Sequence, residues 1–156
     1  MNFAIKAPDE AIEFIEVDKG QPLEFYQGAV GGRIEQHYLL TDDGSRIAFF
    51  CNEDGKSKNL PLNFPLYLGN EEHIPPEHRG KIYEYVVGTV IFTGNRIDKK
   101  GMVVGLSEEE IKSLEEHFSF SMVDMIRGYK VVGGQPRELF PGASDDLKNR
   151  ARGLVS

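Results

Sequence analysis

The dipeptide Asp43-Gly44 constrains the fold of this chain more than any other local feature. It stands between two runs of β-prone residues, 33–40 and 45–51. Asp-Gly in that setting is the strongest short-range signal for a β-hairpin, because its residues readily adopt the turn that joins two antiparallel strands. The sequence therefore predicts a hairpin here, and with it an antiparallel sheet that needs further strands.

Alternating apolar residues predict those further strands. Segments 2–7 and 11–18 form a second hairpin at the start of the chain. Segment 81–93 is rich in Tyr, Val and Ile and is expected to be one long strand with a bulge or a close backbone approach at Gly88. We expect 63–68 to be irregular or a single helical turn, 69–80 to be an exposed connector, and 102–104 to be a short strand.

Helix start signals predict two or three helices. Pro22 fits the first turn of a short helix around Leu23, and Ser107 begins a capping box that opens a second helix around Ile111. Ser121 repeats the capping pattern for a third. We therefore expect an α/β protein of the α+β type, with a mostly antiparallel sheet of five or six strands and two or three helices packed on it. The helices around Leu23 and Ile111 are expected to cover one face of that sheet.

Charge and composition exclude several classes of protein. The 156 residues carry a net charge of -7, which argues against broad nucleic-acid binding and against anionic membranes, because both depend on many Lys and Arg contacts. No apolar run reaches the roughly 18 residues of a membrane span, and the first residues do not resemble a signal peptide. Cys51 is the one cysteine, so we expect no internal disulfide, and its place after two phenylalanines is typical of a small buried hydrophobe. A cytoplasmic location is expected.

The common catalytic and cofactor motifs are absent from the sequence, which has no phosphate-binding loop, dinucleotide fingerprint, nucleophile elbow or Cys-x-x-Cys pair. His73 and His78 are the nearest pair of histidines, but they flank two prolines and lack the spacing and further ligands of a zinc site. We expect no catalytic residue, no metal and no cofactor.

Three marked segments follow one another in a fixed order. They are Val-Gly-Gly-Arg-Ile-Glu at 30–35, Asn-Glu-Asp-Gly-Lys with Leu-Pro-Leu-Asn inside 52–63, and Gly-Thr-Val-Ile-Phe at 88–92. In this order they resemble the domain of unknown function 3846, a family of small phage and plasmid proteins, over roughly residues 11–119. The resemblance implies a protein of a mobile genetic element.

The resemblance also divides the chain. Residues 1–119 are expected to form a single α+β domain, and residues 120–156 a carboxy-terminal extension that is partly helical. Because the extension adds large apolar residues to a domain complete without it, we expect it to make intermolecular contacts, as an interface with a partner or within a homo-oligomer, unless it is only a tail. These apolar residues are Phe120, Met122, Met125, Ile126, Leu139 and Phe140.

The loop at 52–63 has two readings. Asn, Asp, Gly and Pro suit a set of turns, with Gly55 in a positive-φ conformation. Ammonium and amide groups gathered in an acidic protein instead suit a phosphate, ribose or carboxylate. On the second reading the ligand-binding residues are Asn52, Glu53, Lys56, Lys58, Asn59 and Asn63, joined by Arg33 and Thr89 if their strands lie beside the loop.

Three functions remain open. The favoured one is a non-catalytic accessory protein that sequesters a small anionic, nucleotide-like host ligand in counter-defence. The alternative is an inhibitor that binds a host enzyme or defence complex through its acidic helix and its extension. The least favoured is a small nucleotide hydrolase, for which Glu53 beside Lys56 is the one candidate acid–base pair.

Overall fold

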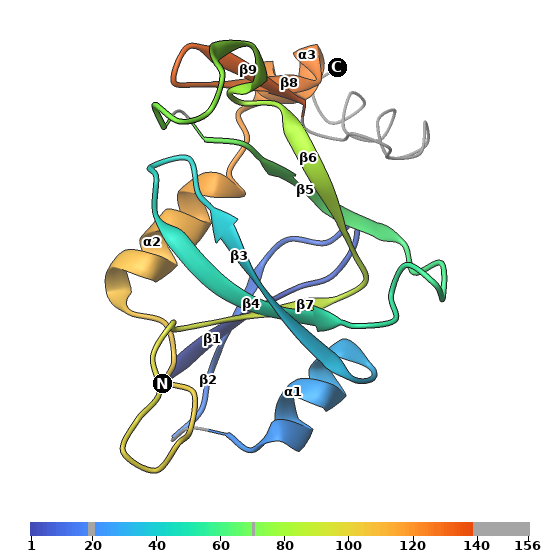
Figure 1. Ribbon diagram of the computed structural model, residues 1–156, viewed down its shortest axis with the longest axis vertical. Coiled ribbons are helices and arrows are strands. Elements are labelled where there is room, and N and C mark those ends of the chain that lie inside the picture. The colour runs from blue at the N-terminus through green and yellow to red at the C-terminus, as the bar shows by residue number, and fades with distance from the viewer. Residues whose placement is uncertain (19–20, 70, 139–156) are drawn as a thin grey trace.

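The computed structural model describes residues 1–18, 21–69 and 71–138, and it has an α+β fold as predicted. A five-stranded sheet in the order β2-β1-β7-β4-β3 forms the centre, and every neighbouring pair in it is antiparallel. Two further pairs, β5-β6 and β8-β9, form small separate sheets (Figure 1). The elements are β1 (Asn2–Lys6), β2 (Glu13–Glu16), α1 (Leu23–Val30), β3 (Ile34–Leu40), β4 (Arg46–Asn52), β5 (Leu62–Tyr67), the 3₁₀ turn η1 (Pro76–His78), β6 (Ile82–Val87), β7 (Val90–Thr93), α2 (Glu108–His117), α3 (Met122–Arg127), β8 (Tyr129–Val132) and β9 (Gln135–Glu138).

The hairpin predicted at Asp43-Gly44 is confirmed, and its turn docks on a helix. β3 and β4 pair along their whole length, and Gly44 has a φ of 86°. The carboxylate of Asp43 accepts hydrogen bonds from Ser113 Oγ of α2, at 2.6 Å, and from Thr41 Oγ1. These bonds, with that from Ser113 as the strongest, lower the pKa of Asp43 to about 2. The turn therefore also fixes the sheet against α2.

The two longest helices cover opposite faces of the sheet, so the prediction that they share one face is wrong. Successive strand residues point to opposite faces. Phe49 of β4 packs in a cluster with Leu114 of α2, whereas the next residue, Phe50, packs with Tyr26 of α1. Figure 1 shows the two helices on different sides of the strands. An amphipathic pattern shows that a helix buries one side, but it does not say which face of a two-sided sheet receives it.

The segment predicted as one strand at 81–93 is two strands in different sheets. β6 pairs with β5, and β7 pairs with β1 and β4. Between them Gly88 has a φ of 74°, a conformation that side chains rarely adopt, and the chain changes direction there rather than bulging.

Residues 62–67 form β5 rather than the irregular or helical segment expected at 63–68. Pro65 weakened the strand signal, because proline cannot donate a ladder hydrogen bond. It is tolerated because, among the described residues, β5 pairs with β6 alone, where Pro65 faces Tyr85. The strand expected at 102–104 is reduced to a single bridge between Ile97 and Val103.

The helix predicted after Ser121 is confirmed as α3, with a full capping box, and it leads into the β8-β9 hairpin, which the sequence did not predict. Side chains of that hairpin reach Asp42, whose carboxylate lies 3.0 Å from His117 Nδ1, accepts a 2.6 Å hydrogen bond from Lys130 Nζ and binds Arg137 Nη1. This ionic cluster joins the extension to residues 1–119. The apolar residues Leu139 and Phe140, and all of the extension after them, lie outside the described residues.

Candidate functional site

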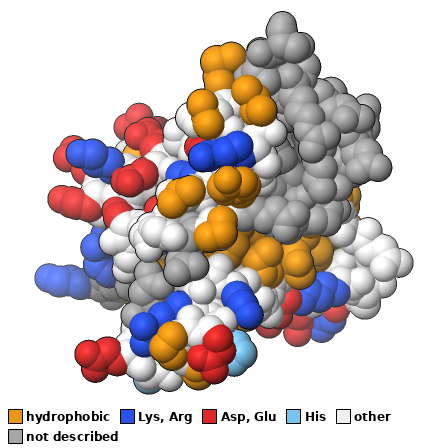
Figure 2. All heavy atoms as spheres, turned by 90° about the horizontal axis from the view of Figure 1, so that it is seen from above, with side chains coloured by type: hydrophobic (Ala, Val, Ile, Leu, Met, Phe, Trp, Pro, Cys, Tyr) orange, Lys and Arg blue, Asp and Glu red, His pale blue; other side chains and the backbone are white. Residues whose placement is uncertain are grey.

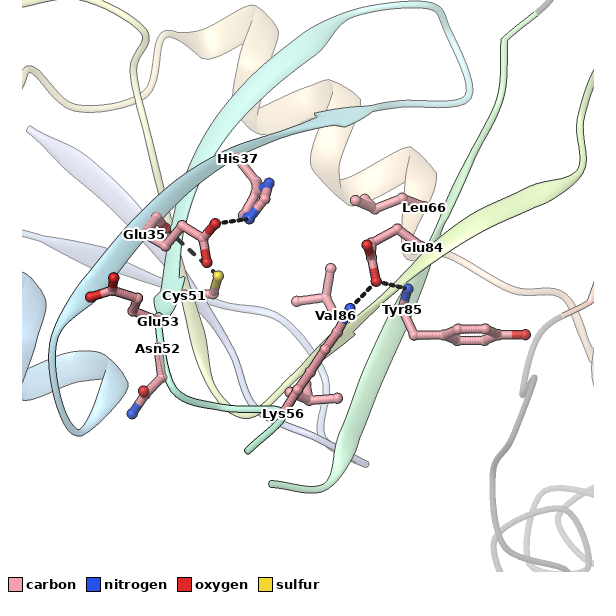
Figure 3. A pocket seen from close by; sticks show the side chains of 11 residues that line it. Glu35, His37, Cys51, Asn52, Glu53, Lys56, Leu66, Glu84, Tyr85 and Val86 are labelled. Atoms are coloured by element: carbon pink, nitrogen blue, oxygen red, sulfur yellow. Dashed lines mark hydrogen bonds and ion pairs between the residues drawn. The ribbon is translucent and has the colours of Figure 1, made fainter. Parts of the chain in front are cut away.

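A pocket of about 170 Å³ opens between the β3-β4 hairpin and the β5-β6 pair (Figure 3). Polar side chains come to it from three directions. β3 supplies Glu35 and His37, β4 supplies Cys51, β6 supplies Glu84, and the loop after β4 supplies Lys56. Apolar and aromatic side chains of Leu66, Tyr85, Val86 and Val87 also line it.

Strand register brings Glu35, His37 and Cys51 together on one side of the pocket. Glu35 lies directly across from Cys51, and His37 is two residues further along β3 on the same face. His37 Nε2 lies 3.3 Å from Glu35 Oε1, and the Cys51 thiol donates a 3.6 Å hydrogen bond to the Glu35 carbonyl. Burial, and next the charge of Glu35, raise the pKa of the Cys51 thiol to about 11.

Lys56 and Glu84 face that group from across the pocket and bind each other (Figure 3). The hydrogen bond from Lys56 is the main reason that the pKa of Glu84 lies below its usual range. Both side chains are well exposed, at 62% and 41%, so their ion pair is screened by water and open to exchange with a ligand. The pocket lining contains three carboxylates, those of Glu35, Glu53 and Glu84, and one ammonium group, that of Lys56.

Three of the predicted ligand-binding residues, Asn52, Glu53 and Lys56, line this pocket. The amide of Asn52 is buried and already engaged, because Nδ2 donates to the Val30 carbonyl at 3.3 Å and Oδ1 accepts from the Asp54 backbone at 2.8 Å. Asn52 thus holds the end of α1 against the loop.

The family model described as "Domain of unknown function (DUF3846)" matches residues 1–119. The chain belongs to the DUF3846 family. The match confirms the resemblance and begins ten residues earlier than the sequence motifs indicated. No curated protein and no solved structure matched the chain. Within residues 1–18, 21–69 and 71–138, no helix is long and apolar enough to cross a membrane.

The remaining predicted ligand residues in this DUF3846 region lie outside the pocket lining. Arg33 donates to both carboxylate oxygens of Asp54, at 3.0 and 3.1 Å, and its Nε lies 3.5 Å from Glu53. Asn63 bonds the backbone of Lys6 and Gly88. Lys58 and Asn59 are exposed, and Thr89 is half-buried beside Gly88.

Asn59, and not Gly55, adopts the positive-φ conformation that was predicted for Gly55. Gly55 is absent from the residues with positive φ in the described chain, whereas Asn59 has a φ of 54°. Gly55 is buried instead, and a Cβ there would lie 3.0 Å from Val87. Asparagine tolerates the left-handed region better than most residues, so the turn did not require a glycine at its positive-φ position.

The sequence did not indicate Glu35, His37 or Glu84 as site residues, and it favoured Cys51 as a buried hydrophobe over a nucleophile. A signal existed for the first two, because residues two apart on a strand share a face. No sequence signal marked Glu84, because it lies beside Lys56 only once β6 has paired with β5. Glu53 and Lys56, the one candidate acid–base pair in the sequence, bind Arg33 and Glu84 respectively.

Proposed function

We propose that the protein acts by binding, and that its ligand is a small anionic, nucleotide-like molecule held at the pocket between β3-β4 and β5-β6. The observation that carries the proposal is that part of the polar loop, including Lys56, lines a pocket whose other polar groups come from distant strands. Convergence of separate segments on one concave site is typical of ligand-binding sites. We further propose, from the resemblance noted in the sequence, that this binding serves a phage or plasmid in the host cytoplasm, where sequestering a host signal would act in counter-defence.

The anionic group of the ligand would bind Lys56 at the pocket mouth, with Lys58 on the same loop. There it competes with Glu84, whose carboxylate binds the Lys56 ammonium. A volume of about 170 Å³ is below the roughly 300 Å³ of a typical pocket for a whole small molecule. The pocket therefore takes one part of the ligand, and its carboxylates suit a ring with amino donors.

Calorimetric titration with AMP, GMP and inorganic phosphate tests this proposal. Lys56→Ala removes the ammonium and should weaken nucleotide binding by about 1 to 3 kcal/mol, the usual contribution of a charge-assisted hydrogen bond. Glu84→Gln removes the competitor and should tighten binding. Lys99→Ala, an exposed lysine outside the pocket lining, is the matched control and should leave affinity unchanged. The proposal would be refuted if no nucleotide bound, or if neither Lys56→Ala nor Glu84→Gln changed the nucleotide affinity.

The exposed apolar surface of the extension favours binding to a host protein as the second candidate function. Side chains on and around α3 and β8 are exposed although they are large and apolar: Phe120, Met122, Val123, Ile126, Tyr129 and Val131. Figure 2 shows hydrophobic side chains gathered on this end of the molecule. Gathered exposed apolar side chains often mark interaction sites in soluble proteins. On this reading the protein is an inhibitor of a host enzyme or defence complex, and the same surface would serve a homo-oligomer.

A further inference from the structure

We propose that Glu35, His37 and Cys51 form a binding site for one divalent transition-metal ion, of which Zn²⁺ fits best. Each residue offers one ligand atom, and the three atoms lie within 4.8 Å of one another. The inference does not depend on the proposed nucleotide ligand, because it concerns a cation and does not involve Lys56.

The geometry needs only small movements. With bond lengths of about 2.0 Å to nitrogen and oxygen and about 2.3 Å to sulfur, tetrahedral ligand atoms stand about 3.3 to 3.6 Å apart. His37 Nε2 and Glu35 Oε1 are already 3.3 Å apart. The two remaining gaps, from Cys51 Sγ to the Glu35 carboxylate and to the ligand nitrogen of His37, are no more than 4.8 Å. Closing them to tetrahedral spacing takes about 1 Å of movement by Glu35 and His37 toward Cys51, and both of these side chains are partly exposed, at 50% and 42%.

The backbone supports the same geometry. All three residues belong to β3 and β4, which are paired in continuous register from Ile34↔Asn52 to Leu40↔Arg46. Sites on paired strands are held more firmly than sites on loops. The ring of His37 also packs against Phe49 of the neighbouring strand, with centroids 5.9 Å apart, which limits its orientations.

The types of ligand atom indicate which metal would bind. Sulfur and imidazole nitrogen favour zinc and its neighbours among the transition metals, whereas magnesium and calcium prefer oxygen ligands alone. Three protein ligands on one wall of an open pocket leave a fourth coordination position for water or another molecule, as in catalytic zinc sites. The excess of carboxylates in the lining further favours a cation.

Titration of the full-length, metal-free protein with Zn²⁺ alone and with Co²⁺ alone tests the site. We expect one ion per chain, and the Co²⁺ form should show the ultraviolet charge-transfer absorption of a cobalt–thiolate bond. Cys51→Ala should abolish that absorption, and His37→Gln should weaken binding about 100-fold or more, since even residues that only support metal ligands contribute 10- to 100-fold. His78→Gln, an exposed histidine of the connector, is the matched control and should bind as the wild type does.

The variants also separate metal binding from folding. Cys51 is buried, so Cys51→Ala carries some risk to stability, but the His37 side chain is 42% exposed and its replacement should leave the fold intact. Full Zn²⁺ affinity in His37→Gln, a Co²⁺ spectrum without the thiolate band, or loss of binding in His78→Gln would each overturn the proposal. Nucleotide binding by a protein that takes no metal would refute this inference and leave the proposed function standing.

Discussion

Asp42→Asn should lower the free energy of unfolding by about 3 to 5 kcal/mol, the usual loss when one partner of a buried ion pair is removed. The Asp42 side chain is 7% exposed and is bound by His117, Lys130 and Arg137, whose side chains are 7%, 18% and 11% exposed. Burial alone would raise the pKa of Asp42, but the hydrogen bond and charge of His117, then those of Lys130, outweigh it and hold the pKa below its usual range. Asparagine keeps the shape of the side chain and leaves Lys130 and Arg137 without their counter-charge.

The stability lost in Asp42→Asn should mainly weaken the contact between the extension and residues 1–119. Lys130 and Arg137 belong to β8 and β9, so we expect the hairpin to detach and to be cleaved faster in limited proteolysis. Urea unfolding followed by circular dichroism gives the stability, with Asp18→Asn, at an exposed aspartate, as the matched control. Equal stability of the two variants would contradict an anchoring role for Asp42.

Asn63→Ala should cost about 3 kcal/mol of stability, although the sequence suggested a ligand contact for this residue. Its Nδ2 donates to the carbonyls of Lys6, at 2.7 Å, and Gly88, at 2.8 Å, and its Oδ1 accepts from Lys6 Nζ at 3.1 Å. Leaving buried polar groups unpaired costs about 1 to 3 kcal/mol each. Lys6 is 8% exposed, and burial lowers its pKa to about 8, so it has little access to water as a replacement partner.

Asn59→Gly is the matched control for Asn63→Ala. Asn59 is an exposed asparagine of the same loop with a φ of 54°, a conformation that glycine adopts freely, so stability should change by less than about 0.5 kcal/mol. Thermal and urea unfolding of both variants give the comparison. If Asn63→Ala has the same melting temperature as the wild type, the hydrogen bonds of Asn63 do not hold β5 to β1. Asn63 would then again be a candidate for contacting a ligand.

The sequence predicted the fold well because its strongest signals are local. Asp43-Gly44 marked the central hairpin, and Ser107 and Ser121 marked the starts of α2 and α3. What it missed depends on contacts between distant segments. Whether a helix covers one face of the sheet or the other, and where 81–93 leaves one sheet for another, are decided by packing across the whole domain.

Register explains why the cluster in the pocket was missed. With Asp43 and Gly44 as a two-residue loop, Asp42 would face Ser45 and Glu35 would face Asn52. The structure has a three-residue loop closed by Gly44, so Glu35 faces Cys51. A shift of one residue moves every side chain to the other face. Pairing Glu35 and His37 with Cys51 therefore required the turn type, which the dipeptide alone does not determine.

Tertiary contacts also change the charge expected around the 52–63 loop. Arg33 and Lys56 looked like free positive charges in the sequence, but each has a carboxylate partner in the fold, Asp54 and Glu84 respectively. Asp54 is in the loop itself, and only tertiary structure shows that it turns toward Arg33. Of the predicted cations, Lys56 is the one that lines the pocket, and the binding proposal therefore depends on it.

Native mass spectrometry of the full-length protein purified from host cells tests the central claim, that the pocket beside Lys56 holds a small ligand, most directly. The wild type and Lys99→Ala should carry the added mass of one small organic molecule, and Lys56→Ala should have lost it. The same added mass in all three proteins, a bare chain in the wild type, or a polypeptide partner in place of the small molecule would contradict the claim, and the last result would favour an inhibitor that binds a host protein.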